Sequence, residues 1–378
     1  MKIGLIHYSY PPTVGGVEFI LQGQAREFAR HGHKVHIICK NRGRPVPEKN
    51  IKCFLLPHRQ ENLKRRLRQM IFGLDLILVH NVMSMPFDMA LTSAIWELAT
   101  ETRKKTRWIF WTHDLALLNP DYPSYNTSRL PFSLLKTRHP SARYVTISEL
   151  RRTELCQLLK IPRSQVRIVP DGIDVAALLD LDTAVWNFFL REKLHERDHV
   201  LFLPTRVLPR KNLEDAIELI ASLKALEKKP TLIITGAHDP HNASSALYLR
   251  KIRELIQKRK LRKEIIFMHV LIPVGFRQLL SLYRLCDAVL MTSRQEGFGL
   301  PLLEAGAHSK PVICPRRPPF TEIVEDRAVF LDEGRGKARK ISRALNGSPT
   351  VTHFKRVIRE YSWEAIWKNH LSLLLPKR

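Results

Sequence analysis

Short apolar segments alternate with longer amphipathic segments along most of this 378-residue chain. The apolar segments have the length of strands, whereas the longer ones repeat apolar residues at helical spacing. Strands that alternate with helices favour a parallel sheet, because each parallel crossover needs a connection about as long as a helix. The sequence therefore predicts an α/β fold with doubly wound parallel sheets.

The alternation occurs twice, on either side of an acidic, irregular stretch. The strands predicted before this stretch are Lys2–His7, Lys34–Cys39, Lys52–Leu56, Leu76–His80, Trp108–Trp111 and Arg143–Thr146. Those predicted after it are His199–Leu203, Thr231–Thr235, Ile265–Met268, Ala288–Met291 and Pro311–Ile313. The helices predicted between them are Val17–Arg30, Pro86–Ala99, Glu149–Leu159, Glu214–Leu226, Ala246–Lys260 and Arg277–Leu285, with a last helix over Ser362–Leu375.

This pattern divides the chain into two Rossmann-like domains. We expect a first domain over residues 1–170, a junction over 171–198 and a second domain over 199–360. The C-terminal helix expected in residues 361–378 can pack back on the first domain. Two such domains create a cleft, and ligands of open α/β sheets bind beyond the carboxyl ends of the strands. The functional residues should therefore lie in the loops that follow strands.

The chain is strongly basic, with 62 Lys and Arg against 36 Asp and Glu and a formal net charge of +26. Such an excess is typical of proteins that bind phosphate backbones. The basic residues are nevertheless spread over both halves, and no helix-turn-helix, zinc-finger or RNA-recognition pattern is present. We therefore do not expect nucleic acid to be the main partner.

Other sequence features exclude further classes. The five cysteines are scattered and form no Cys-x-x-Cys pair, which disfavours a disulfide framework or a zinc site. No apolar run approaches the roughly 18 residues of a membrane span, and the first residues enter a strand pattern instead of a secretory signal. These features predict a cytoplasmic protein.

The most informative motif is residues 296–305, EGFGLPLLEA, directly after a predicted strand. Its glycines allow the backbone to approach a ligand closely, and its proline suits the first turn of a helix. The unpaired amides of Gly299 and Leu300 can then face an anion or hydroxyl groups, with Glu296 and Glu304 on either side. The alternative is an ordinary helix cap with solvated carboxylates.

A basic loop follows the predicted strand His199–Leu203. Arg206 and Lys211 can clamp a diphosphate, the first as a planar fork and the second as a point charge. Basic pairs at this spacing are frequent in so basic a chain, so their location between a buried strand and a helix carries the interpretation. The alternative is a solvated basic surface.

Two loops in the first half are weaker candidates. Gly15 and Gly16 permit a tight turn and open a helix whose dipole favours an anion, or they serve only to reverse the chain. His113 and Asp114 follow another strand. The imidazole can donate a hydrogen bond to substrate oxygens, or the two residues can form a structural pair.

In this order the motifs resemble the GT-B glycosyltransferases of the retaining family 4 (group 1) type, which transfer sugars from nucleoside diphosphate sugars. The resemblance covers nearly the full length, including Val169–Asp174 (VPDGID) at the junction. It implies a GT-B fold, in which two Rossmann-like domains face a central cleft. The sequence departs from the family at Asp171, where Asn is usual, and at Thr205, where Gly usually precedes the arginine of the clamp.

The resemblance also implies roles for the motif residues. In the family the matching Arg and Lys hold the diphosphate, the first Glu and the loop amides bind the sugar, and the second Glu binds the ribose. The catalytic residues implied here are His113, Arg206, Lys211 and Glu296. The implied donor-binding residues are Gly15, Gly16, Arg206, Lys211, Glu296, Gly297, Phe298, Gly299, Leu300 and Glu304.

The implied reaction moves a hexose, with retention, from a UDP-glucose or GDP-mannose type of donor to a hydroxyl acceptor. The expected context is the synthesis of a glycan, a glycolipid or a cell-envelope polysaccharide. No cofactor and no metal ion is expected beyond the nucleotide sugar. The alternatives are a GT-B phosphorylase-like enzyme with pyridoxal phosphate and a nucleic-acid-binding α/β protein.

A predicted helix in residues 61–72 has Leu63, Leu67, Met70 and Ile71 on one side and basic residues on the other. Such a helix can rest on anionic lipid and bring the enzyme to a lipid-linked acceptor. The alternative is a helix that packs into the core and exposes a solvated basic face.

Overall fold

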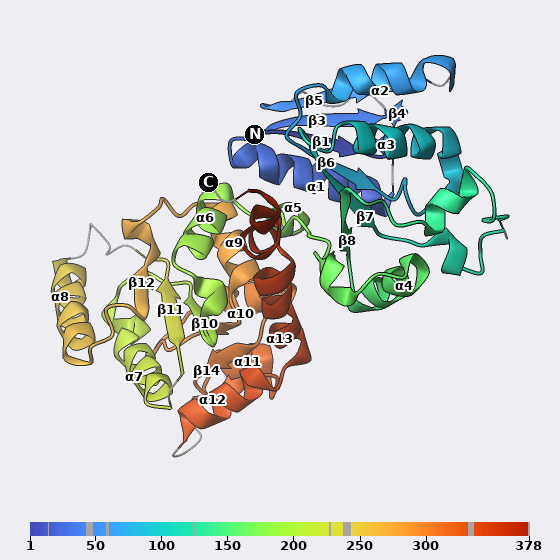
Figure 1. Cartoon of the computed structure of the whole chain (residues 1–378). Coiled ribbons are helices and arrows are strands. Elements are labelled where there is room, and N and C mark those ends of the chain that lie inside the picture. The colour runs from blue at the N-terminus through green and yellow to red at the C-terminus, as the bar shows by residue number, and fades with distance from the viewer. Residues whose placement is uncertain are drawn as a thin grey trace. The chain divides into compact units, whose positions relative to one another are not determined.

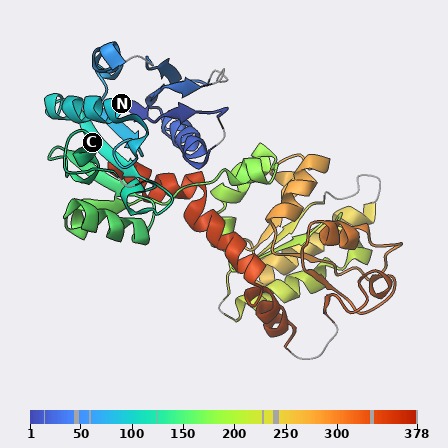
Figure 2. The ribbon, with the colours of Figure 1, turned by 90° about the vertical axis from the view of Figure 1, so that its right-hand side faces the viewer.

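The computed structural model describes residues 1–13, 15–42, 48–57, 60–123, 125–226, 228–236, 243–331 and 336–376. The chain forms two compact units (Figure 1). The first comprises Met1–Asp174 and Glu360–Arg378, and the second comprises Val175–Arg359. The chain therefore leaves the first unit once and returns to it, and Figure 2 shows both chain ends in this unit.

The first unit contains a seven-stranded parallel sheet in the order β5-β3-β1-β6-β7-β8-β9. Its strands are β1 (Lys2–Ile6), β3 (Lys34–Cys39), β5 (Ile51–Leu55), β6 (Leu76–His80), β7 (Arg107–Thr112), β8 (Ala142–Thr146) and β9 (Val166–Ile168). Its helices are α1 (Gly16–Arg30), α2 (Leu63–Ile71), α3 (Met89–Glu101), α4 (Glu149–Leu159) and α14 (Trp363–Asn369). A short parallel pair, β2 (Ser9–Tyr10) and β4 (Asn41–Arg42), lies outside this sheet.

Helices cover both faces of the first sheet. On one face α2, α3 and α4 pack on the strands, with Leu67 and Ile95 fully buried. On the other face α1 and α14 do so, with Phe28 and Ile366 fully buried. Because both faces are covered, the central strands are apolar almost without interruption, and this is why they stood out in the sequence.

The second unit contains a six-stranded parallel sheet in the order β12-β11-β10-β13-β14-β15. Its strands are β10 (His199–Leu203), β11 (Pro230–Ile234), β12 (Ile265–Phe267), β13 (Ala288–Leu290), β14 (Val312–Cys314) and β15 (Val329–Phe330). Its helices are α5 (Val175–Leu178), α6 (Thr183–Arg191), α7 (Leu213–Lys224), α8 (Ala243–Lys258), α9 (Phe276–Leu285), α10 (Leu300–Ala307), α11 (Phe320–Val324), α12 (Lys337–Asn346) and α13 (Pro349–Arg356).

A buried ion pair fastens α13 to the second sheet. The Lys355 ammonium lies 2.6 Å from the Asp287 carboxylate and also donates to the carbonyl oxygens of Arg197 and Asp198. The backbone amide of Val200 donates to the same carboxylate at 2.6 Å. Burial raises the pKa of Asp287, and the lysine opposes this shift. The Val200 amide and the carbonyl groups of Arg197 and Asp198 are thus hydrogen-bonded inside the core.

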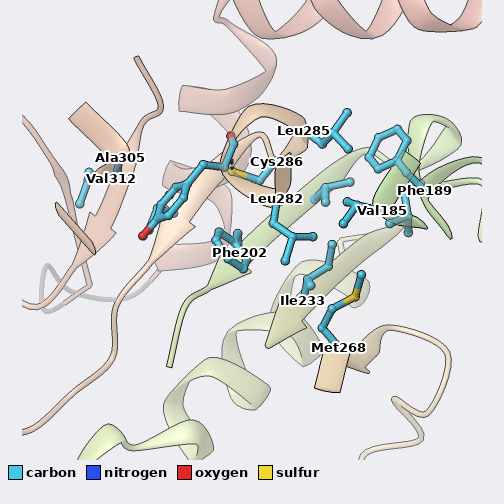
Figure 3. Close-up of a cluster of buried hydrophobic side chains, with 14 of the residues drawn as sticks. Val185, Phe189, Phe202, Ile233, Met268, Leu282, Leu285, Cys286, Ala305 and Val312 are labelled. Atoms are coloured by element: carbon cyan, nitrogen blue, oxygen red, sulfur yellow. Dashed lines mark hydrogen bonds between the residues drawn. The ribbon is translucent and has the colours of Figure 1, made fainter. Parts of the chain in front are cut away.

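The structure corrects the junction expected over residues 171–198. Only residues up to Asp174 belong to the first unit, whereas α6 is part of the core of the second. Figure 3 shows Val185 and Phe189 turned toward Leu282 and Leu285 of α9. The acidic composition suggested a linker, but the apolar residues of this stretch fall on one side of a helix and are buried there.

The other differences concern elements that were not predicted, including the helices α11, α12 and α13. All predicted strands agree with the structure within one residue at each end, but β2, β4, β9 and β15 were not predicted. These strands have two or three residues each, and β9 and β15 lie at the edges of their sheets. Segments this short hold too few residues for a pattern, so strand pairing alone identifies them.

One buried carboxyl group makes the stability of the first unit depend on pH. Glu27 of α1 lies 2.6 Å from Arg30, which also contacts Glu364 of α14. Burial raises the pKa of Glu27 from 4.5 to about 7. The folded state therefore binds this proton more tightly than the unfolded state. The contribution to stability is complete below about pH 4.5 and is lost as the pH rises through 7.

We therefore expect Glu27→Gln, which cannot ionise, to gain stability relative to the wild type as the pH rises from 5 to 8. Chemical denaturation at both pH values measures this difference. The exposed Glu149→Gln serves as the control. An equal pH dependence of the wild type and Glu27→Gln would show that Glu27 titrates normally.

Candidate active site

A hollow of about 680 Å³ lies in the second unit beyond the carboxyl ends of β10 and β11. Arg206 and Lys211 line it from the loop after β10, and Glu304 lines it from α10. Phe276 at the start of α9 and Gly236 after β11 complete the wall. The structure therefore brings together three of the predicted site residues in one hollow.

Lys211 is held by a second predicted residue, Glu296. Their side chains form an ion pair and are only 13% and 10% exposed. The Ser293 hydroxyl donates to the same Glu296 oxygen at 2.6 Å, and the Arg210 guanidinium lies 3.6 Å from the other oxygen. The ammonium of Lys211 is thus fixed at the hollow, and it has three N–H donors to share between Glu296 and a ligand.

Glu304 is positioned by a buried tyrosine. The Tyr283 hydroxyl donates to Oε2 of Glu304, and the Tyr283 ring stacks on His308 with a centroid distance of 5.2 Å. Burial, reinforced by the neighbouring carboxylate, raises the pKa of Tyr283. Tyr283 therefore remains a hydrogen-bond donor, and the Glu304 carboxylate keeps a fixed orientation with lone pairs available at the hollow.

The glycine loop has the predicted geometry at the start of α10. Gly299 has φ +111°, a backbone conformation that strains other residues. A side chain at Gly297 would meet open space. Phe298 and Leu300 are more than half exposed. Amides in the first turn of a helix lack intrahelical acceptors, so this end of α10 offers donors beside the wall formed by Pro301 and Glu304.

His113 in the first unit lies in a different environment from the expected one. Its Nε2 is 3.0 Å from Nδ1 of His80, and its Nδ1 is 3.5 Å from Oδ2 of Asp171. Its backbone amide donates to Asn81 at 2.7 Å. The residue is 3% exposed. Both ring nitrogens therefore face protein groups, and the carboxylate partner is Asp171 and not the adjacent Asp114.

Gly15 and Gly16 begin α1 as predicted, with Gly15 as the N-cap. The carboxylate of Glu18 folds over this end of the helix, and a Cβ on Gly15 would come within 2.1 Å of it. The Ser9 hydroxyl donates to Glu18. The negative charge at this helix N-terminus is thus the chain's own Glu18, which fits a structural cap better than an anion site.

Sequence reasoning missed several partners in these clusters. Arg210 lies in the same basic loop as Lys211, so its position in the sequence could have identified it. The sequence gives no such signal for the other three, which contact their partners only after the loops and helices pack. These are Tyr283 with Glu304, Ser293 with Glu296 and His80 with His113. Within the described ranges, no group of three or more His, Cys, Asp or Glu side chains is arranged to hold a metal ion.

The apolar side of α2 belongs to the core. Leu63, Leu67 and Ile71 are at most 3% exposed, and Lys64 and Arg68 pair with Glu101 of α3 at 3.0 and 2.5 Å. The proposed lipid contact through these apolar residues is therefore corrected, because they are not available at the surface. Across the described segments, no helix combines the length and apolar character that crossing a membrane requires.

Two family models match the chain, one for each part of it. The model described as glycosyltransferase family 4 matches residues 14–177, and the model described as glycosyl transferases group 1 matches residues 186–361. The chain belongs to the group 1 (family 4) glycosyltransferases. It is a transferase with two Rossmann-like domains, and this assignment favours an enzyme over the nucleic-acid-binding alternative.

Individual relatives are distant. An uncharacterized glycosyltransferase of Methanocaldococcus jannaschii is 23% identical and covers 99% of this chain and 97% of its own length. A D-inositol 3-phosphate glycosyltransferase of Jonesia denitrificans is 29% identical over 46% of this chain and 41% of its own. The crystal structure of Anabaena HepE with UDP and glucose aligns with 99% of both chains at 18% identity and a TM-score of 0.39, too low to support an inference.

Proposed function

We propose that this glycosyltransferase moves a hexose from a nucleoside diphosphate sugar to a hydroxyl group, with retention at the anomeric carbon. The observation that carries this proposal is the hollow of the second unit, which is lined by Arg206, Lys211 and Glu304. Two cations suit a diphosphate, and a fixed carboxylate suits the two hydroxyls of a ribose. The hollow therefore has groups for both parts of a nucleoside diphosphate.

The chemical step releases the diphosphate, on which negative charge develops in the transition state. Arg206, Lys211 and the first amides of α10 supply positive charge and dipoles for this leaving group. Glu296 holds Lys211 before a ligand arrives, so the ammonium need not reorganise during the reaction. Because these groups do for the diphosphate what a divalent cation does in other transferases, we propose that the reaction needs none.

The names of the relatives are consistent with a sugar transfer but differ in product. They include an O-antigen chain mannosyltransferase of Salmonella typhimurium and a probable sucrose-phosphate synthase of Thermosipho melanesiensis. We therefore propose UDP-glucose and GDP-mannose as the first donors to test. The hydroxyl acceptor is proposed to belong to a glycan, a glycolipid or an envelope polysaccharide.

Donor binding is expected to depend on Arg206 and Glu304. Arg206→Ala and Glu304→Ala should each weaken the binding of UDP-glucose or GDP-mannose by about tenfold, the usual effect of losing one charged hydrogen bond. Calorimetric titration and thermal shift with both donors measure this. Arg253→Ala and Glu322→Ala change exposed residues of the same unit that do not line the hollow, and they should bind as the wild type does. Four equal affinities would refute the donor site.

Transfer is expected to survive chelation. Activity in excess EDTA should equal activity without it. The physical reason is that Arg206, Lys211 and the α10 amides are proposed to neutralise the diphosphate in place of a divalent cation. Loss of activity in EDTA, with recovery on adding Mg²⁺ or Mn²⁺, would contradict the proposal.

We also propose a peripheral contact with anionic membranes that does not involve the buried apolar side of α2. Phe72 directly follows α2 and is 87% exposed, and a Cβ on the next residue, Gly73, would lie 4.0 Å from the Lys2 ammonium. Arg65 and Arg66 of α2 are exposed as well. An apolar side chain beside cationic groups is the composition that anionic lipid surfaces attract. The expected cytoplasmic location stays a prediction.

Sedimentation with phosphatidylglycerol vesicles tests this contact. Binding should occur at low salt, disappear at high salt and fall when Phe72, Arg65 and Arg66 become Ser. Arg253→Ser with Lys258→Ser removes an equal charge from the second unit and should leave binding unchanged. If the wild type does not sediment at low salt, the acceptor reaches the enzyme from solution.

A further inference from the structure

The C-terminal segment is hydrogen-bonded to Ile173, just before the chain leaves the first unit after Asp174. The amide of Ile173 donates to the carbonyl of Tyr361 at 2.8 Å, and the amide of Trp363 donates to the carbonyl of Ile173 at 3.2 Å. These bonds form a parallel bridge between Ile173 and Ser362. The chain segment around Asp171 is therefore held by residues almost 200 positions later in the sequence.

The Trp363 ring fills a slot between two glycines. A Cβ on Gly23 of α1 would lie 2.0 Å from the ring, and a Cβ on Gly172 would lie 2.6 Å from it. Trp363 is 7% exposed. Because real Cβ atoms do not approach so closely, both positions need glycine for the ring to fit. The ring thus sets the distance between α1 and the residue that follows Asp171.

Asp171 in turn faces the imidazole of His113. A carboxylate only accepts hydrogen bonds, so Nδ1 of His113, 3.5 Å away, carries the proton. Nε2 of His113 then has a lone pair, which accepts from Nδ1 of His80 at 3.0 Å. This leaves Nε2 of His80 without a proton, and among the described residues that atom has no partner.

The opposite proton arrangement is unfavourable at both ends. It would aim a lone pair of His113 at the Asp171 carboxylate and would leave a buried N–H of His80 without an acceptor. Burial lowers the pKa of the fully buried His80, so that ring is neutral. Neighbouring groups around this pair include Asn81, which holds the His113 amide, and His7, whose Nδ1 donates to the His80 carbonyl at 2.9 Å. The Trp111 ring stacks on both histidine rings.

We propose that Asp171 is a positioning residue for His113, and that Trp363 of the C-terminal segment holds Asp171 in place. The consequence for transfer rests on the proposed function and on the family resemblance, which implies that His113 is a catalytic residue. Asp171 fixes the tautomer and the orientation of the imidazole, and the loop that carries His113 keeps one geometry. The residues proposed to bind the donor diphosphate belong to the second unit, so the effect falls on turnover and not on donor affinity.

The experiment compares Asp171→Ala with Asp171→Asn. An asparagine oxygen accepts from the same Nδ1–H, whereas alanine accepts nothing. Nitrogen NMR of histidine-labelled protein reports which nitrogen of His113 carries the proton, with His113→Gln to assign its signals. Asp171→Ala should reduce the population of the Nδ1-protonated form, which only the His80 contact then favours, and lower kcat by about tenfold, with the donor KM within about twofold. Asp171→Asn should retain the signature and most of the rate.

The role of Trp363 is tested with a matched tryptophan of the same helix. Trp367 stacks on His31 at 3.7 Å and does not fill the glycine slot. Trp363→Leu should move the His113 signature and kcat in the same direction as Asp171→Ala, whereas Trp367→Leu should lower Tm and leave both unchanged. If Trp363→Leu fails to fold, Gly172→Ala displaces the ring by a smaller change.

Several outcomes overturn the proposal. An unchanged His113 signature in Asp171→Ala would show that Asp171 does not set the proton position. Equal rate losses in Asp171→Ala and Asp171→Asn would assign the effect to charge instead of hydrogen bonding, and equal effects of the two tryptophan variants would make Trp363 merely structural. If the wild type transfers no sugar, the proposed function fails, yet the NMR arm still decides whether Asp171 positions His113.

Discussion

The parallel direction of the strands is the constraint on which the rest of this structure depends. In each unit all main-sheet strands point the same way, so their carboxyl ends meet at one edge. Loops that lie far apart in the sequence are therefore neighbours there. Lys211 follows β10 and Glu296 follows β13, and they form an ion pair across 85 residues of chain. His80 ends β6 and reaches His113 beyond β7 in the same way.

The charged groups of the second unit are arranged before any ligand binds. Lys211 is paired with Glu296, and Glu304 is held by Tyr283, whose ring is buried in the core. A charge with a fixed partner loses less freedom when it meets a substrate than a mobile surface charge does. This preorganisation distinguishes the lysine and the carboxylates of the hollow from most of the basic residues that give the chain its net charge of +26.

The first unit uses aromatic packing for a comparable purpose. Trp363 belongs to the C-terminal segment. Its ring packs between Gly23 and Gly172, next to the segment that carries Asp171. The carboxylate of Asp171 and the buried ring of His80 then fix both nitrogens of His113. A residue identified by a short motif is thereby controlled by partners from three other parts of the chain.

The sequence by itself determined most strands, most helices and the loops that carry the motifs. Apolar strands such as His199–Leu203 are legible because burial on both faces leaves no polar positions to interrupt them. The glycine loop at 296–305 is legible because a helix N-terminus at Gly299 requires a glycine conformation. The resemblance to a glycosyltransferase family rested on such local signals, and the family models confirm it.

Only the tertiary structure decided which side chains meet. The acidic stretch after Asp174 contains a core helix because its apolar residues pack against α9. The apolar side of residues 61–72 is buried because α3 covers it. Likewise, Asp171 and not Asp114 faces His113. Local sequence sets backbone preferences over a few residues, whereas the partner of a side chain depends on how distant segments pack, and no short-range pattern encodes that choice.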